Sequence, residues 1–88
     1  MFSDKRKELC LKLIEKSQLL GLSNQTRLEA KEFAEYHEFG LCLDLITTQI
    51  NEYDIAIDDD FLEIVFSLAD KMNISKNNFY FLKRNLNS

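Results

Sequence analysis

The sequence has no proline, no tryptophan and only two glycines, Gly21 and Gly40. A glycine-rich loop that holds a phosphate group therefore cannot be built from it. Cysteine and histidine are nearly as scarce, because Cys10 and Cys42 lack CxxC spacing and His37 is the only histidine. These shortages argue against a nucleotide-binding loop, a zinc site and a catalytic triad. We therefore predict a protein that is not an enzyme and that uses no cofactor and no metal.

Long apolar runs are also missing. No stretch approaches the length needed to cross a membrane, and the charged N-terminal region lacks the uncharged core of a secretory signal. Two cysteines are too few for a disulfide framework, so both are predicted to be reduced, buried thiols. With 88 residues, 45% of them hydrophobic and 30% charged, the chain has the size and composition of a single domain covering 1–88. We expect a cytoplasmic protein.

Apolar residues recur at helical spacing along most of the chain. The pattern predicts helices over about 4–20, 23–36, 41–52, 58–73 and 76–86, with a short extended connector over 53–57. Ser23 and Ser75 are predicted N-caps, and Gly21 is a predicted helix stop. Helices this short depend on packing against one another. The predicted fold is therefore all-α, a compact bundle of four to five short helices.

The same spacing predicts which side chains point into the core. The expected inward residues are Cys10, Leu13, Ile14, Ser17 and Leu20; Ala30, Phe33, Ala34 and His37; Leu41, Cys42, Leu45, Ile46, Gln49, Ile50 and Tyr53; Ile55 and Ile57; Phe61, Ile64, Val65, Leu68 and Met72; and Phe79, Leu82 and Leu86.

Charge is distributed unevenly along the chain. Residues 29–70 hold twelve carboxylates and a single base, Lys31, for a net charge of −11, while the flanks hold ten bases and three acids. A field of one sign repels nucleic acid and anionic lipid and attracts a basic surface. We therefore predict a basic protein as the partner, and no binding to nucleic acid or membranes.

Three consecutive aspartates, Asp58, Asp59 and Asp60, open the fourth predicted helix. One aspartate is enough to cap a helix, and further acids in the first turn favour the positive end of its dipole. A calcium loop of the EF-hand type is disfavoured, because the glycine that it requires is missing. Capping and contact with a basic partner both stay open and are compatible. Glu52 and Asp54, just before the run, favour the partner.

The second predicted helix carries Glu29, Glu32 and Glu35 on its outer side and is followed by Glu38, with Lys31 as the only base among them. A solvated helix face usually mixes the two signs, often as Glu–Lys pairs four residues apart. A face of like charge destabilises the fold, so its presence is more typical of a binding surface.

Two tyrosines, Tyr36 and Tyr53, bracket the third predicted helix beside these acids. Tyrosine supplies apolar area and a hydroxyl at low entropy cost, so both are candidate anchors of an interface. The predicted partner-binding residues are Glu35, Tyr36, Glu38, Glu52, Tyr53, Asp54, Asp58, Asp59 and Asp60.

A family resemblance lies between residues 33 and 74. The positions that carry it are Ala34-Glu35 and His37-Glu38, then Leu41, Leu45 and Ile50, then Glu52-Tyr53-Asp54-Ile55 with Ile57, and finally Ile64, Leu68-Ala69 and Met72-Asn73-Ile74. Together they resemble the MafI-type bacterial immunity proteins, small helical partners encoded beside secreted polymorphic toxins and similar to those of contact-dependent growth-inhibition systems. One departure is that Glu38 and Phe39 separate the histidine from Gly40. The resemblance implies a cognate toxin, often a ribonuclease of the EndoU type, bound and inactivated in the cytoplasm.

Two other functions fit an acidic helical domain of this size. The first is a regulatory adaptor that binds a basic host protein, which the charge pattern permits equally well. The second is an acyl-carrier domain, which needs a serine after an aspartate at a helix start to hold its prosthetic group. No serine follows an aspartate in this sequence, so the carrier is the weaker alternative.

Overall fold

A computed structural model describes residues 4–86 of the chain. It contains four α-helices followed by a 3₁₀ helix: α1 (Lys5–Leu20), α2 (Asn24–Glu35), α3 (Phe39–Glu52), α4 (Asp59–Lys71) and η1 (Lys76–Asn85). The only β-type pairing within 4–86 is an isolated parallel bridge between Ile57 and Leu86. The predicted all-α bundle of four to five short helices is confirmed.

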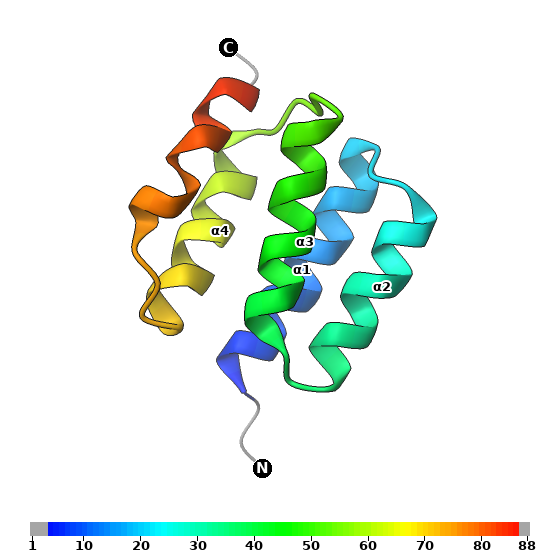
Figure 1. Ribbon diagram of the computed structural model, residues 1–88, viewed down its shortest axis with the longest axis vertical. Helices are drawn as coiled ribbons and strands as arrows, with labels where there is room; N and C mark the ends of the chain where they lie inside the picture. Colours follow the sequence, from blue (N-terminus) through cyan, green and yellow to red (C-terminus); the bar gives the residue numbers. More distant parts are fainter. Residues whose placement is uncertain (1–3, 87–88) are drawn as a thin grey trace.

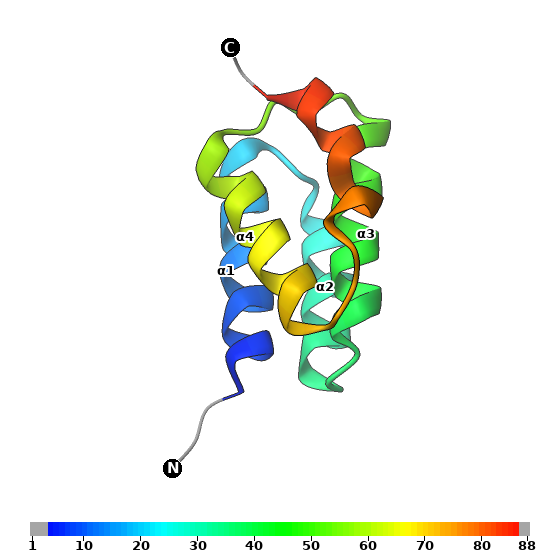
Figure 2. The ribbon, with the colours of Figure 1, turned by 90° about the vertical axis from the view of Figure 1, so that its left-hand side faces the viewer.

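The helices form two layers. In Figure 1, α3 lies in front between η1 and α2. Figure 2, turned by 90°, shows α1 and α4 together on the left, in the layer that lies behind α3 in Figure 1. Consistent with this, α3 packs against α1, α2 and η1, whereas α2 packs mainly against α1 and α3. None of the helices within the described residues is both long and apolar enough to cross a lipid bilayer.

Four of the five helices begin at a side-chain cap. The capping side chains accept hydrogen bonds from backbone N–H groups two or three residues ahead: Asp4 from Arg6 (2.9 Å), Ser23 from Thr26 (3.2 Å), Asp58 from Phe61 (2.8 Å) and Ser75 from Asn77 (3.2 Å). These bonds satisfy N–H groups that have no partner within the helix. The predicted caps Ser23 and Ser75 are confirmed. α3 has no such cap.

Each α-helix is closed by a residue in the left-handed conformation. These residues are Gly21 (φ 112°), His37 (φ 60°), Asp54 (φ 50°) and Asn73 (φ 58°). The N–H group of the next residue then bonds five residues back, as in Leu22 to Ser17 (2.9 Å) and Ile55 to Ile50 (3.0 Å). This is the Schellman arrangement, which usually uses glycine. Only α1 uses glycine here, so the other three ends carry some conformational strain.

Replacing Asp54 by glycine should therefore stabilise the fold. Asp54→Gly removes both the left-handed strain and a negative charge at the negative end of α3, which together predict a gain of about 1 kcal/mol in the free energy of unfolding. Asp54→Asn removes only the charge, since asparagine also tolerates the left-handed conformation, and is the matched control. Urea unfolding of both variants measures the difference, and a glycine variant no more stable than the asparagine variant would contradict the strain.

The buried face of α3 differs from the predicted one. Leu41 and Tyr53, expected to point inward, are 51% and 67% exposed, whereas Leu43 and Thr47 are fully buried. The reason is that α3 begins at Phe39 and contacts helices on three sides. Its buried surface is therefore wider than a single stripe and is rotated away from the predicted one. The residues buried on α3 are Phe39, Cys42, Leu43, Ile46, Thr47 and Ile50.

His37 is another correction. It was expected on the inner face of α2 but lies beyond the end of that helix, exposed, with its ring 5.3 Å from the ring of Phe39. A left-handed residue that closes a helix points away from the helical face that its sequence position suggests. In the connector, Ile57 is buried and Ile55 half-buried, as the alternation predicted.

The last helical segment is a 3₁₀ helix held by one asparagine. Phe79 and Leu82 are buried as predicted, but the closing contact is made by Asn85, which is only 8% exposed. Its side-chain N–H₂ group donates to the carbonyl oxygens of Ile50 (3.2 Å) and Ile55 (3.1 Å). The backbone carbonyl oxygen of Asn85 accepts from the N–H of Ile57 at 2.7 Å. Asn85 therefore fixes η1 to the end of α3 and to the connector that follows.

Candidate protein-binding surface

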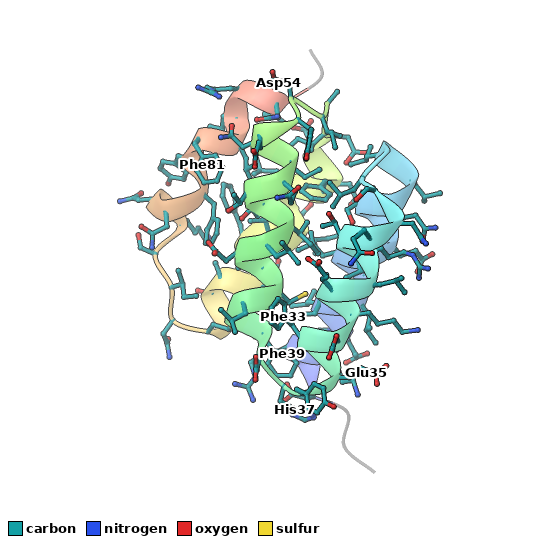
Figure 3. The ribbon with its side chains drawn as sticks, turned by 45° about the vertical axis from the view of Figure 1, so that its right-hand side comes forward. Phe33, Glu35, His37, Phe39, Asp54 and Phe81 are labelled. Carbon is teal, nitrogen blue, oxygen red and sulfur yellow. The ribbon has the colours of Figure 1, made fainter. Side chains whose placement is uncertain are left out.

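The predicted partner-binding residues do not come together in one patch. Figure 3 shows Glu35 and His37 at one end of the bundle and Asp54 at the other. The predicted residues Tyr36 and Glu38 lie in or beside the α2–α3 turn, whereas Glu52, Tyr53 and Asp54 lie at the far end of α3. α3 has 14 residues and is about 20 Å long, which separates the two groups.

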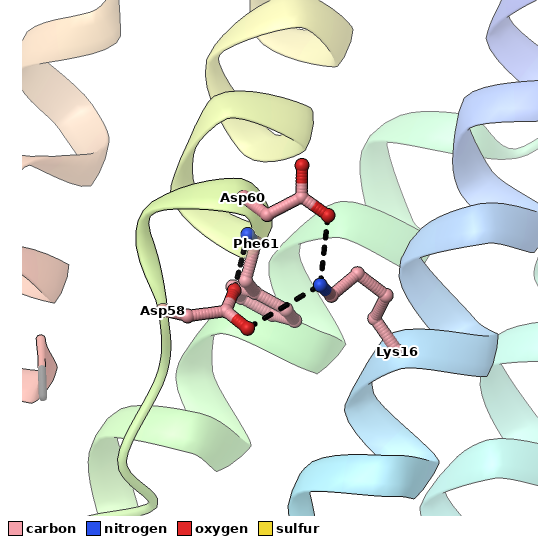
Figure 4. A network of polar contacts seen from close by, with 4 residues as sticks. All are labelled: Lys16, Asp58, Asp60 and Phe61. Atoms are coloured by element: carbon pink, nitrogen blue, oxygen red, sulfur yellow. Dashed lines mark hydrogen bonds and ion pairs between the residues drawn. The ribbon is translucent and has the colours of Figure 1, made fainter.

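The aspartate run serves the fold in two of its three positions (Figure 4). Asp58 caps α4, and its second carboxylate oxygen accepts from Lys16 Nζ of α1 at 3.4 Å. Asp60 accepts from the same Lys16 Nζ at 2.8 Å. Lys16 therefore ties the start of α4 to α1. Within the described residues only Asp59 of the run has neither contact.

The cap also shifts the titration of Asp58. The hydrogen bond from the Phe61 N–H, assisted by the Lys16 ammonium, holds the pKa of Asp58 below its usual value. The two carboxylates in turn raise the pKa of Lys16, Asp60 more strongly than Asp58. A carboxyl whose pKa is lower in the folded state stabilises the fold above its unfolded pKa, and the stabilisation is lost as the pH falls through the folded pKa.

Asp58→Ala should therefore lower the free energy of unfolding by about 0.5–2 kcal/mol near neutral pH, because an N-cap is lost. The deficit relative to the native chain should begin to shrink below about pH 4, the ordinary pKa of an aspartate, and should shrink further as the pH falls through the lower folded pKa of Asp58. Asp59→Ala is the control and loses only an attraction to the helix dipole, at the low end of about 0.3–1 kcal/mol. Urea unfolding over a range of pH measures both, and equal losses in the two variants would contradict the capping role.

Two hollows lie side by side along α2 and α3. The smaller is lined by Glu29, Glu32, Phe33, Tyr36 and Glu38. The larger, of about 740 Å³, is lined by Gly21, Leu22, Ser23, Gln25, Thr26, Glu29, Gln49, Tyr53 and Ile55. Glu29 lines both hollows, and we call the two together the α2–α3 groove.

The charged residues in the lining of the α2–α3 groove are acidic, and most of them lie in the smaller hollow. Its lining holds three carboxylates, Glu29, Glu32 and Glu38, and neither hollow is lined by any lysine or arginine of the described residues. Tyr36, 71% exposed, belongs to one hollow and Tyr53, 67% exposed, to the other. An acidic depression that ends in exposed tyrosines has the composition of a protein-binding surface for a basic partner.

Some of the predicted partner-binding residues line this groove. Tyr36, Glu38 and Tyr53 were predicted as binding residues and do line it. Glu29 and Glu32 lie on the predicted acidic face of the second helix but are not among the predicted partner-binding residues. Glu35 lines a separate hollow on the other flank of α2, together with Leu28, Lys31, Glu32 and Tyr36.

Gln25 and Gln49 were missed as groove residues for different reasons. Gln25 carries no signal in the sequence, since it is one polar residue among several at the start of α2. Gln49 was assigned to the core by its spacing, and it is half-buried at the wall of the groove.

The two cysteines belong to the core, and the environment of Cys42 keeps its thiol protonated. Both are free and fully buried. A hydrogen bond in which the Cys42 thiol donates to the Cys10 sulfur raises the pKa of Cys42, and burial raises it further. A thiol kept protonated in this way is a poor nucleophile and a poor metal ligand. Within the described residues, no group of three or more His, Cys, Asp and Glu side chains is arranged to hold a metal ion.

Compared with models of protein families, with curated proteins and with solved structures, the chain matches none. The candidate surface is therefore defined by its geometry and charge.

Proposed function

We propose that this chain is an immunity protein, which binds a cognate secreted toxin through the α2–α3 groove and keeps it inactive in the cytoplasm. The observation that supports this most directly is the lining of the groove, which among residues 4–86 holds three carboxylates, no base and two exposed tyrosines. The toxin is a basic protein, in our proposal a ribonuclease. The chain acts by binding and not by catalysis.

The charge and the tyrosines have separate tasks in this mechanism. Opposite charge raises the rate of association, up to about 10⁸–10⁹ M⁻¹s⁻¹ at low salt. Exposed ion pairs contribute little to affinity, because solvent screens them. Slow dissociation instead needs aromatic anchors buried at the interface, for which Tyr36 and Tyr53 stand exposed at the surface of the free protein.

Inhibition follows from the same charges. A ribonuclease must attract a polyanion, so its substrate-binding surface is basic. An acidic groove on a rigid helical frame is complementary to that surface and competes with RNA for it. The assignment of the toxin to the EndoU type rests only on the family resemblance of residues 33–74.

The test neutralises the groove and compares it with an equal change of charge elsewhere. Glu29→Gln, Glu32→Gln and Glu38→Gln are combined in one variant. The control combines Glu15→Gln, Glu63→Gln and Asp70→Asn, three exposed acids of α1 and α4. Both variants are co-expressed with the product of the neighbouring gene, and association with that product is measured by stopped flow at several salt concentrations.

The groove variant should no longer protect against the toxin. Its association rate at low salt should fall by about 10-fold or more and should lose most of its dependence on salt. The control should retain both. Equal behaviour of the two variants would reject the groove as the binding surface. If the neighbouring product is neither toxic nor bound, while a basic host protein binds the native chain and not the groove variant, the chain is a regulatory adaptor instead.

A further inference from the structure

The larger hollow of the α2–α3 groove has an unusual combination of side chains. It lies where the turn between α1 and α2 meets the end of α3 (Figure 1). Of the residues that the structure describes, Glu29 is the one charged residue in its lining. Tyr53 adds an aromatic ring, and Leu22 and Ile55, buried and half-buried, add apolar surface.

The Glu29 carboxylate is held in position. Gln25, one helical turn earlier, donates from its side-chain amide to one oxygen of Glu29 at 3.1 Å. The bond fixes the rotamer of the carboxylate through a neighbour on the same face of α2. The second oxygen has no partner among the described residues, so it remains available to a donor in the hollow.

Tyr53, at the end of α3, lines the same hollow as Glu29. Its N–H group bonds to the carbonyl of Gln49 at 3.0 Å, and the left-handed Asp54 then turns the chain away. The ring remains 67% exposed. An exposed tyrosine ring beside a carboxylate can take a planar cation, which stacks on the ring and donates to the acid.

We propose that this hollow receives an arginine side chain of the partner. The guanidinium stacks on Tyr53 and donates to the open oxygen of Glu29, and the methylene groups of the arginine pack over Leu22 and Ile55. Arginine fits better than lysine, because its flat fork stacks on aromatic rings and bonds carboxylates with fixed geometry. This inference rests on the proposed function, since it names the group by which the basic partner is recognised.

An anion is the competing ligand, because the hollow includes the start of α2. That helix end is already occupied in part, since Ser23 Oγ accepts from the N–H of Thr26. The negative end of α3 faces the same hollow and offsets the positive end of α2. With Glu29 inside, the hollow is unfavourable to phosphate or carboxylate groups.

The test uses the chain alone and is read residue by residue by NMR of the isotope-labelled protein. The probes are N-acetyl-arginine amide, the lysine analogue, the uncharged citrulline analogue and inorganic phosphate. The arginine probe should shift the signals of Glu29, Gln49 and Tyr53 and bind several-fold more tightly than the lysine probe. The citrulline probe and phosphate should cause no saturable shifts there.

Variants locate the binding within the groove. Glu29→Gln should weaken the arginine probe by about 10-fold, because a charge-assisted hydrogen bond is lost. Glu32→Gln, an exposed acid of the smaller hollow, is the matched control and should change it less than twofold. Tyr53→Leu, at a residue that is mostly exposed and leaves the fold intact, should reduce the preference for arginine over lysine.

Equal binding of the arginine and lysine probes, shifts away from the hollow, or saturable binding of phosphate in it would each overturn the inference. The arginine pocket and the proposed function can be rejected independently of each other. If neutralising the whole groove abolishes toxin binding while the arginine probe does not bind, only the arginine pocket is wrong.

Discussion

Asn85→Asp should lower the free energy of unfolding by about 3–5 kcal/mol near neutral pH, because it leaves an unpaired charge in a buried position. The native side chain is 8% exposed and donates to the carbonyl oxygens of Ile50 and Ile55. A carboxylate at the same place has no hydrogen to donate, and its oxygens face two carbonyl oxygens. η1 should detach from α3 and from the connector.

The pH dependence of this variant has a definite sign. Burial and the two carbonyls raise the pKa of the introduced carboxyl in the folded state above its unfolded value. Below the unfolded pKa the group is neutral in both states, so only the lost hydrogen bonds remain as a deficit, and the variant recovers part of its stability relative to the native chain. Asn78→Asp, exposed and on the same segment, is the control and should change stability by no more than about 0.5 kcal/mol. Equal loss in the two variants by urea unfolding would show that Asn85 does not hold η1.

Leu43→Ala should cost about 2–5 kcal/mol of unfolding free energy, because a fully buried leucine leaves a cavity between helices. Leu41→Ala makes the same chemical change two residues away, where the side chain is 51% exposed, and should cost less than about 1 kcal/mol. Thermal and urea unfolding of the pair test which face of α3 is buried. A larger loss of unfolding free energy for Leu41→Ala than for Leu43→Ala would show instead that the face predicted from spacing alone is the buried one.

Helix positions and caps could be predicted from the sequence because their causes are local. Ser23 and Ser75 each bond a backbone N–H within three residues, and such signals are visible in a short window, although the sequence left open which aspartate of 58–60 caps α4. The buried face of α3 could not be predicted in the same way. It depends on which helices lie on its flanks, and spacing within one segment carries no information about three neighbours at once.

The contacts that were missed join distant parts of the chain. Lys16 reaches Asp58 and Asp60 across 42 and 44 residues, so the capping and pairing of the aspartate run could not be separated from a docking role beforehand. Asn85 reaches Ile50 across 35 residues, and nothing near it marks it as buried. For the site, charge and aromatic composition marked Tyr36, Glu38 and Tyr53 as partner-binding candidates; all three line the groove, and their role in binding stays a prediction. Glu29, which lines both hollows of the groove, could not be predicted, because its place in the groove depends on the packing of α2 against α3.

The shallow anchoring of α2 has a consequence for dynamics. Its buried side chains are Thr26, Ala30 and Ala34, all small, with Phe33 half-buried beside them, and its main contacts are with α1 and α3. A segment with so little buried apolar surface unfolds locally at a smaller free energy than the whole domain, so its amide hydrogens exchange with solvent sooner than those of α3. A ligand that bridges α2 and α3 must suppress this opening. Slower exchange in α2 would then report occupancy of the surface even where no side chain moves.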